Sequence, residues 1–284
     1  MIKAILLKTL FFVNCNLLLI NRLYRIIIRV GDIMENNVKV INYGTFNHDG
    51  LDFEYHVSGN ENGETLVMLN GNGGDYHCFE GDLYVPLSEH FKIIRFSTRG
   101  TGKTPLGDKK LTFELFSDDL KALLDYLGEK QVNICGFSDG GNLGMVFSVT
   151  YPEYVKKLAV FGSNLNTRGT KTLDQLGIIK DHRIYAIKAA ITKDPEWIRR
   201  REIEGLMVGQ PHLSYKKLSQ LKIPFLNCFG EFDMIKRSHS RKMTKAVEGA
   251  EEIMVLNGGH STAFRKTDFL ILPVVEKFFM QSNK

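Results

Sequence analysis

The chain is poor in cysteine and lacks low-complexity segments, long apolar runs and clustered metal ligands. Its four cysteines, Cys15, Cys78, Cys135 and Cys228, form no Cys-x-x-Cys pair, and two of them lie in apolar stretches. This usage favours reduced, buried thiols over disulfides. The histidines show no spacing such as His-x-x-x-His, so we expect no metal ion and no other cofactor. The balance of 43% hydrophobic and 24% charged residues is that of an ordinary globular chain.

Most of the sequence also lacks a strong excess of basic residues. The net charge of +5 comes mainly from residues 1–33, which contribute +4, and residues 34–284 carry only +1. A protein that binds nucleic acid needs a basic patch. We therefore expect a small-molecule partner and no nucleic acid, while the oligomeric state stays open.

Residues 1–33 form an apolar, basic leader. A membrane span requires about 20 apolar residues, whereas only 13 residues separate Lys8 from Arg22, and three of them are asparagines. A signal peptide requires a small-residue cleavage site, which is absent. We expect the native fold to begin at Met34 without the leader, with a peripheral membrane-binding helix as the alternative. The location predicted from these features is cytoplasmic, with no stable membrane span.

The remaining pattern predicts one α/β domain over residues 34–284. Alternating residues on either side of Asn47-His48-Asp49-Gly50 predict an antiparallel hairpin. Short apolar runs then alternate with helical stretches, which predicts a mostly parallel, twisted sheet with helices on both faces. The predicted strands cover residues 65–69, 92–96, 132–135, 158–161, 225–229 and 253–256, and the clearest helices cover 113–127 and 269–279. Residues 164–221 lack a strand-like run and are predicted to form a short helical cap insertion.

A serine lies at a predicted strand-to-helix junction, in the sequence Gly136-Phe137-Ser138-Asp139-Gly140. A sharp turn at this point would force Ser138 into a strained backbone conformation with its hydroxyl exposed. Only glycine at the flanking positions avoids a clash between strand and helix. The pattern indicates that Ser138 is a nucleophile.

Polar residues also follow three other predicted strands. Asn70-Gly71-Asn72-Gly73-Gly74 follows the first parallel strand, Asp233 follows residues 225–229, and His260 follows residues 253–256. Functional groups collect at the carboxyl ends of strands in open α/β sheets, and a serine hydroxyl needs a base such as imidazole to become nucleophilic. Taken singly, each residue has a structural interpretation as a helix cap, a turn acid or a loop histidine.

The order Ser, Asp, His, together with the serine turn and the glycine-rich loop, resembles the α/β-hydrolase family over about residues 38–280. Three further motifs carry the resemblance: Ser97-Thr98-Arg99-Gly100-Thr101-Gly102, Leu221-Lys222-Ile223-Pro224 and Tyr151-Pro152. The resemblance implies the α/β-hydrolase fold, with Ser138 as nucleophile, His260 as base, Asp233 as its orienting acid, and the backbone N–H groups of Asn72 and Asp139 as an oxyanion hole. Glu231 is a minor alternative for the acid.

Two positions depart from the family pattern. Asn70-Gly71 replaces the usual His-Gly of the oxyanion loop, and Ser97-Thr98 replaces the usual acidic residue before Arg-Gly. The segment from Ser97 to Thr104 also nearly matches a phosphate-binding Gly-x-x-x-x-Gly-Lys-Thr loop. Its first position is serine, and Pro105 and Gly107 follow where a helix should begin, which disfavours nucleotide binding.

The resemblance implies a serine hydrolase that cleaves a small carboxylic ester, or a related amide or thioester, through an acyl-enzyme on Ser138. Hydrolysis of a carbon–carbon bond and ligand binding without turnover are the alternatives. Apolar cap residues are predicted to line the substrate pocket, with packing of the cap as the competing interpretation; they are Tyr185, Ile191, Trp197, Leu206 and Met207. The turn is similar to that of biphenyl-hydrolase-like enzymes acting on amino-acid esters, so Asp139 is predicted to meet a substrate ammonium group. A carboxylate favoured at a helix N-terminus is the other explanation.

Overall fold

The computed structural model describes residues 38–77, 83–261 and 268–281 of the chain. The leader at residues 1–33 and the proposed start at Met34 lie outside these ranges. Within them, no helix is long and apolar enough to cross a membrane.

The fold begins with the predicted hairpin of β1 (Val40–His48) and β2 (Leu51–Gly59), which pair antiparallel. The two linking residues, Asp49 and Gly50, both have positive φ values of 55° and 74°. Positive φ at both positions matches the right-handed twist of the flanking strands, and Asp-Gly is a preferred sequence for such a turn. The hairpin prediction is confirmed.

Eight strands form one sheet in the order β1-β2-β4-β3-β5-β6-β7-β8. After the hairpin, the strands are β3 (Thr65–Leu69), β4 (Lys92–Phe96), β5 (Val132–Phe137), β6 (Val155–Phe161), β7 (Phe225–Gly230) and β8 (Glu251–Val255). Strand β2 joins β4 antiparallel, and every pair from β4 to β8 is parallel. The fully buried runs of β3 and β7 fit strands that are covered on both faces. The predicted mostly parallel sheet is confirmed.

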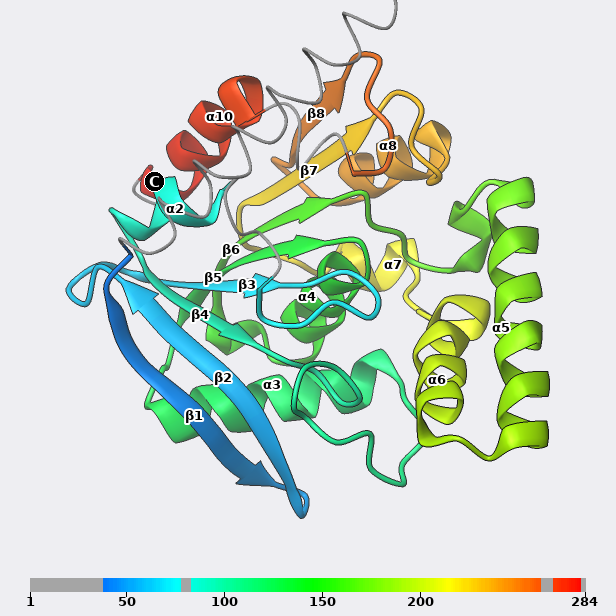
Figure 1. Cartoon of the computed structure of the whole chain (residues 1–284). Coiled ribbons are helices and arrows are strands. Elements are labelled where there is room, and N and C mark those ends of the chain that lie inside the picture. The colour runs from blue at the N-terminus through cyan, green and yellow to red at the C-terminus, as the bar shows by residue number, and fades with distance from the viewer. Residues whose placement is uncertain (1–37, 78–82, 262–267, 282–284) are drawn as a thin grey trace, which may run out of the picture. The chain divides into compact units, whose positions relative to one another are not determined.

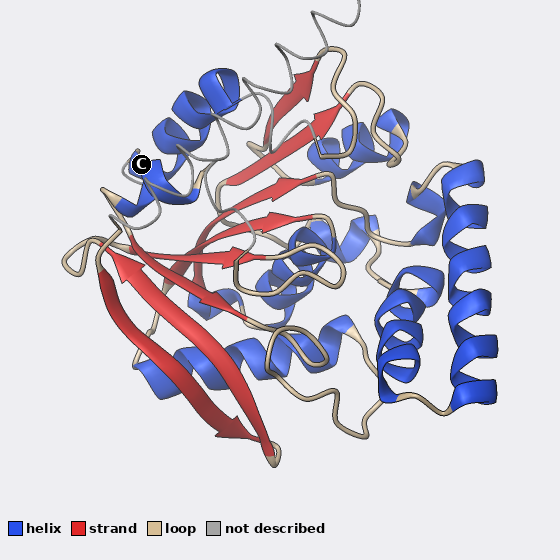
Figure 2. Cartoon of the chain, viewed as in Figure 1, coloured by secondary structure: helices blue, strands red, loops and turns tan. Residues whose placement is uncertain are grey.

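Helices cover the two faces of the sheet (Figures 1 and 2). On one face lie α2 (Tyr84–Ser88) and α10 (Asp268–Met280); on the other lie α3 (Phe113–Leu127), α4 (Asp139–Thr150) and α8 (Arg237–Ala246). Thr112 caps α3 by accepting from the Leu115 N–H, and Gly128 ends it in the left-handed conformation. The short helix η1 (Pro152–Tyr154) leads into β6.

The segment between β6 and β7 contains η2 (Thr167–Gly169), α5 (Thr172–Thr192), α6 (Pro195–Gly209) and α7 (Tyr215–Leu218). The arrowheads of β3, β5 and β6 point toward α6 and α5 in Figure 1, so these helices lie beyond the carboxyl ends of the strands. At the start of the segment, the Leu165 N–H donates to Nε2 of the buried His239, whose Nδ1 lies 2.7 Å from the Tyr215 hydroxyl. Burial lowers the pKa of His239 to about 4, with a further contribution from Lys236 and Lys242.

Candidate active site

Ser138 occupies a strained turn between β5 and α4. Its φ of 52° and ψ of −119° lie outside the regions that residues with a side chain normally occupy. The turn is held by the Ser138 N–H, which donates to the Phe161 carbonyl at 2.8 Å, and by the Ser138 carbonyl, which accepts from the Asn142 N–H at 3.0 Å. The predicted strain at this serine is confirmed.

The glycines around the serine are required by close backbone contacts. A Cβ added at Gly136 would lie 2.5 Å from the Gly140 carbonyl oxygen, and one added at Gly140 would lie 2.0 Å from the Leu69 carbonyl oxygen. Both distances are far below van der Waals contact with rigid backbone. The tight strand-to-helix passage is therefore closed to any larger residue at these two positions.

Ser138, His260 and Asp233 lie in one chain of polar contacts, although they come from three separate loops. His260 Nε2 is 3.0 Å from Ser138 Oγ, and His260 Nδ1 is 2.7 Å from Asp233 Oδ1. Asp233 is fully buried and Oδ1 also accepts from the Ile235 N–H at 2.9 Å, whereas a quarter of the His260 side chain is exposed. This geometry suits an imidazole that donates from Nδ1 to the acid and accepts the serine proton at Nε2.

Glu231, the minor alternative for the acid, has other partners. Its side chain accepts from the Asn257 N–H at 3.1 Å and lies 3.4 Å from Arg237 Nη1. The carboxylate that contacts the imidazole is therefore that of Asp233.

The glycine-rich loop after β3 is tied to both the serine turn and the cap. Asn72 Nδ2 donates to Asp139 Oδ2 at 2.8 Å and to the Ile203 carbonyl of α6 at 2.9 Å. Asn142 Nδ2 donates to the other oxygen of Asp139 at 3.0 Å, and its own orientation is set by the Asn164 N–H, which donates to Asn142 Oδ1. Burial raises the pKa of Asp139, and the hydrogen bonds from Asn72 and Asn142 oppose that rise.

Comparisons with known proteins identify the fold. A family model described as the alpha/beta hydrolase fold matches residues 64–182. The solved structure of MGS-M2, an alpha/beta hydrolase from a Medee basin deep-sea metagenome library, superposes with a TM-score of 0.72 at 19% identity, covering 85% of this chain and 98% of that one. The chain has the α/β-hydrolase fold.

Two further proteins match over most of the chain at low identity. The serine hydrolase BPHL of Homo sapiens is 22% identical over 237 residues, which is 78% of this chain and 80% of that protein. The 2-hydroxy-6-oxo-6-phenylhexa-2,4-dienoate hydrolase of Rhodococcus sp. strain RHA1 has a TM-score of 0.70 at 20% identity, covering 86% of this chain and all of that one. With several other curated relatives, the match spans less than half of the relative's length.

A pocket opens beside the serine turn of this α/β-hydrolase-fold chain. It contains about 420 Å³ of empty space, counting the space at its open mouth. The side chains of Asn72 and Asp139 form part of its polar wall. Its apolar wall comes from the sheet, the helices α3 and α4, and the cap helix α6, through Leu69, Phe96, Phe113, Phe116, Leu143, Ile203 and Leu206.

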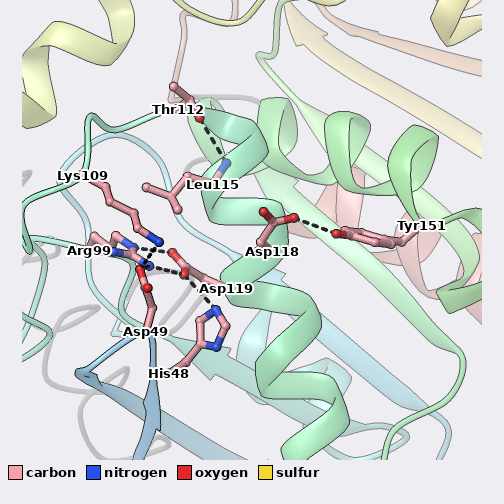
Figure 3. A network of polar contacts seen from close by, with 9 residues as sticks. All are labelled: His48, Asp49, Arg99, Lys109, Thr112, Leu115, Asp118, Asp119 and Tyr151. Atoms are coloured by element: carbon pink, nitrogen blue, oxygen red, sulfur yellow. Dashed lines mark hydrogen bonds and ion pairs between the residues drawn. The ribbon is translucent and has the colours of Figure 1, made fainter.

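Arg99 also lines the pocket and is held by the buried Asp119 and the exposed Asp49. Its Nε and Nη2 donate to the two oxygens of Asp119 at 2.8 and 2.7 Å, and Nη2 also donates to Asp49. Figure 3 shows this network, with Lys109 reaching Asp49 and His48 lying beside Asp119. The hydrogen bonds that Arg99 donates to Asp119 raise the pKa of its guanidinium. The network holds the loop after β4 in place as a wall of the pocket. The next helix, α3, begins only at Phe113, so no helix N-terminus lies near Lys103 to bind a phosphate, as the nucleotide-binding alternative would require.

The predicted cap residues are divided between two environments. Leu206 lines the pocket, together with Ile203 from the same helix, which the sequence analysis did not single out. Trp197 instead stacks on Tyr185 between α6 and α5, with ring centroids 5.8 Å apart, and the Met207 carbonyl accepts from Gln175 of α5. Neither Trp197 nor Met207 is among the residues that line the pocket, and their contact with substrate stays a prediction. Ile203 and Leu206 are three residues apart, so one face of α6 carries both.

Proposed function

We propose that the protein is a serine hydrolase that cleaves a small carboxylic ester through an acyl-enzyme on Ser138. The observation that carries the proposal is the position of His260, with Nε2 at 3.0 Å from Ser138 Oγ and Nδ1 at 2.7 Å from Asp233 Oδ1. Support for the reaction class comes from the alpha/beta hydrolase fold model that matches residues 64–182, and from the similarity to the human serine hydrolase BPHL.

In the proposed first half-reaction, Ser138 Oγ attacks the ester carbonyl carbon while His260 Nε2 takes the hydroxyl proton. The oxyanion forms beside the backbone N–H groups of Asn72 and Asp139; Asp139 is the first residue of α4, where N–H groups have no partner within the helix. Collapse of the tetrahedral intermediate breaks the carbon–oxygen bond to the alcohol, which leaves with the proton from Nε2. General-base assistance of this kind contributes roughly 10² to 10⁴ in rate.

In the proposed second half-reaction, a water molecule loses a proton to His260 Nε2 and attacks the acyl carbon. The intermediate collapses, Ser138 Oγ recovers the proton, and the carboxylic acid leaves. The role of Asp233 is to keep Nδ1 protonated and to stabilise the imidazolium formed in each half-reaction. Because the pocket is small and mostly apolar, we expect short acyl or alcohol groups to be preferred.

The proposal extends to Asp139 as a contact for a substrate ammonium group. Its carboxylate lines the pocket and accepts hydrogen bonds only from the neutral amides of Asn72 and Asn142, and among the described residues no lysine or arginine pairs with it. His260, when protonated, is the charged group that stabilises its negative charge. An amino-acid ester should be hydrolysed faster than its N-acetyl form, and Asp139→Asn should remove that difference.

A fluorophosphonate probe tests the nucleophile. We expect the wild type to label and Ser138→Ala to remain unlabelled. Ser219→Ala is the matched control, since Ser219 is an exposed serine whose hydroxyl donates to the Lys216 carbonyl, away from the pocket. An unlabelled wild type, or equal labelling of Ser138→Ala, would show that the nucleophile assignment is wrong.

The reaction type is tested by steady-state and burst kinetics. Nitrophenyl esters of increasing acyl length should give a burst of one nitrophenolate per active serine, followed by slower turnover. A vinylogous diketone acid offered in parallel probes carbon–carbon bond hydrolysis. Turnover of the diketone acid without turnover of any ester would replace the ester proposal by the carbon–carbon alternative.

A further inference from the structure

The outer face of α5 carries an apolar stripe that no described residue covers. Five large apolar side chains lie on this face at helical spacing, with Lys180 between Leu176 and Ile184. Their exposed fractions are 82% for Leu173, 55% for Leu176, 38% for Ile184, 59% for Ile187 and 77% for Ile191. They are five of the eleven large apolar side chains that are exposed among the described residues. At 1.5 Å per residue the stripe is about 27 Å long. An exposed apolar surface of this size marks a contact with another molecule or a membrane.

The stripe is not the face through which α5 packs on the rest of the cap, because α5 is attached through its opposite side. Tyr185 stacks on Trp197 of α6, Ala189 is buried, and His182 Nδ1 lies 3.1 Å from the Arg201 carbonyl. In Figure 1, α5 forms the rim, with α6 between it and the sheet. The helix therefore has one face bound to the cap and the other open.

The charges around the stripe are mostly positive. Residues 168–193 contain six basic residues and two acidic ones, a net charge of +4, whereas the rest of residues 34–284 carries −3. Lys180 lies within the stripe at helical spacing from Leu176 and Ile184, and Arg183 and Lys188 border it; all three side chains belong to exposed residues. Long cationic side chains beside apolar ones are the pattern of helices that lie in the interface of an anionic membrane.

A second copy of the chain fits this surface poorly. The middle of the stripe is at about residue 182, so two antiparallel copies of α5 would bring Lys180 and Arg183 of one copy against the same residues of the other. A parallel pair would place Lys180 opposite Lys180. Like charges at the centre of an apolar contact oppose association, whereas an anionic lipid surface accepts all of these cations.

We propose that the outer face of α5 docks the cap on an anionic lipid surface, with Leu173, Leu176, Ile184, Ile187 and Ile191 entering the boundary between head groups and acyl chains. Lys180 and Arg183 meet the lipid phosphates, whereas the Lys188 amino group lies 3.8 Å from the centroid of the Trp197 ring on α6. Because α5 lies on the far side of α6 from the pocket, the docked helix leaves the serine turn and the pocket away from the membrane plane.

The test is sedimentation of the full chain with vesicles of phosphatidylcholine alone and of phosphatidylcholine mixed with phosphatidylglycerol in equal parts. We expect binding to the mixed vesicles that falls with added salt. The double variant Ile187→Gln, Ile191→Gln should bind tenfold or more weakly, since two side chains no longer enter the bilayer. Lys180→Gln with Arg183→Gln should lower affinity for mixed vesicles about 30-fold, at about 1 kcal/mol for each cation.

Val40→Gln is the matched control, because Val40 is an exposed apolar residue on β1, 51% accessible. It should bind like the wild type. Residues 1–33 are present in every variant, so their contribution cancels, and an unchanged melting temperature verifies folding. Absence of wild-type binding, or equal binding by the α5 variants, overturns the proposal. A dimer in sedimentation velocity without lipid that Ile187→Gln, Ile191→Gln dissociates also overturns it, in favour of a second copy.

Discussion

Gly162 is the position where one added methyl group would press on the imidazole and the acid together. It follows β6, has a φ of +58°, and donates from its N–H to the Cys228 carbonyl. A Cβ at this position would lie 3.0 Å from His260 Cε1 and Nδ1 and 3.1 Å from Asp233 Oδ2. That carboxylate oxygen is buried without a hydrogen-bond partner among the described residues, so it has no bond that would resist displacement.

Two separate costs follow for Gly162→Ala. The left-handed backbone conformation costs an alanine roughly 1–2 kcal/mol. The contacts at 3.0 Å are a few tenths of an ångström too short, so His260 must move by that amount. Since a misplacement of about 1 Å costs about 10²-fold in rate, a shift of this smaller size should lower kcat about tenfold, while KM changes little.

The matched control is Gly128→Ala at the end of α3. Gly128 has a φ of +74°, and a Cβ there meets no atom within 4 Å, so the substitution carries the backbone cost alone. Melting temperatures and the rate of fluorophosphonate labelling should be measured for both variants. We expect both variants to lose a similar amount of stability. Only Gly162→Ala should be labelled more slowly than the wild type. Equal labelling rates would show that His260 and Asp233 are not held as the contacts imply.

Three further predictions concern single side chains. Asn72→Ala retains the backbone N–H but loses the bonds to Asp139 and the Ile203 carbonyl; we expect kcat to fall about tenfold and stability by about 1–3 kcal/mol, measured by ester kinetics and denaturant unfolding. Burial, with repulsion from Asp181 and Asp139, raises the pKa of Glu204 to about 6. The fold therefore favours the protonated carboxyl, and the stability that Glu204 contributes to the folded state is present below pH 4.5 and is lost as the pH rises through 6. Glu204→Gln should thus be more stable than wild type above pH 6, by about 1 kcal/mol after allowance for its exposed half, and a constant difference from pH 4 to 8 would contradict this. The fold favours the neutral form of His239, so the contribution of His239 to the free energy of unfolding is fully present above pH 6.5. That contribution falls toward pH 4 by up to about 3 kcal/mol. His239→Gln should lack that acid-side loss in thermal unfolding measured across the same window.

The elements that the sequence predicted well are those with strong local signals. The helix over 113–127 and the strands over 65–69 and 92–96 coincide with α3, β3 and β4, because each has a clear apolar pattern of the right period or length. The ends of other strands differ by a few residues. β6 begins at Val155, where the two lysines at 156 and 157 hide the strand pattern. Lys157 is buried there because its amino group is bonded to the carbonyls of Phe278 and Phe279 in α10, a long-range partner that no local pattern reveals.

The pocket was harder to predict than the serine, the acid and the imidazole. Those three follow strand ends, whose position relative to the sheet is fixed by the fold class. Which cap side chains face the pocket depends on the rotation of α6, and the alternation of polar and apolar residues in this charged helix gives little indication of it. Trp197, the most conspicuous apolar residue of the cap, packs against Tyr185, while the less conspicuous Ile203 reaches the pocket.

Asn72 links the three parts that form the site, since its amide joins the loop after β3 to Asp139 at the serine turn and to the Ile203 carbonyl in the cap. An asparagine can do this because one Nδ2 group carries two donor hydrogens. A shift of α6 by more than hydrogen-bond reach would break the bond to Ile203 and leave the bond to Asp139, so the loop and the serine turn would move as one unit while the pocket wall opened. The cap and the proposed oxyanion donors are therefore coupled through one side chain, and Asp139 serves as the anchor for that coupling whether or not it also meets a substrate ammonium group.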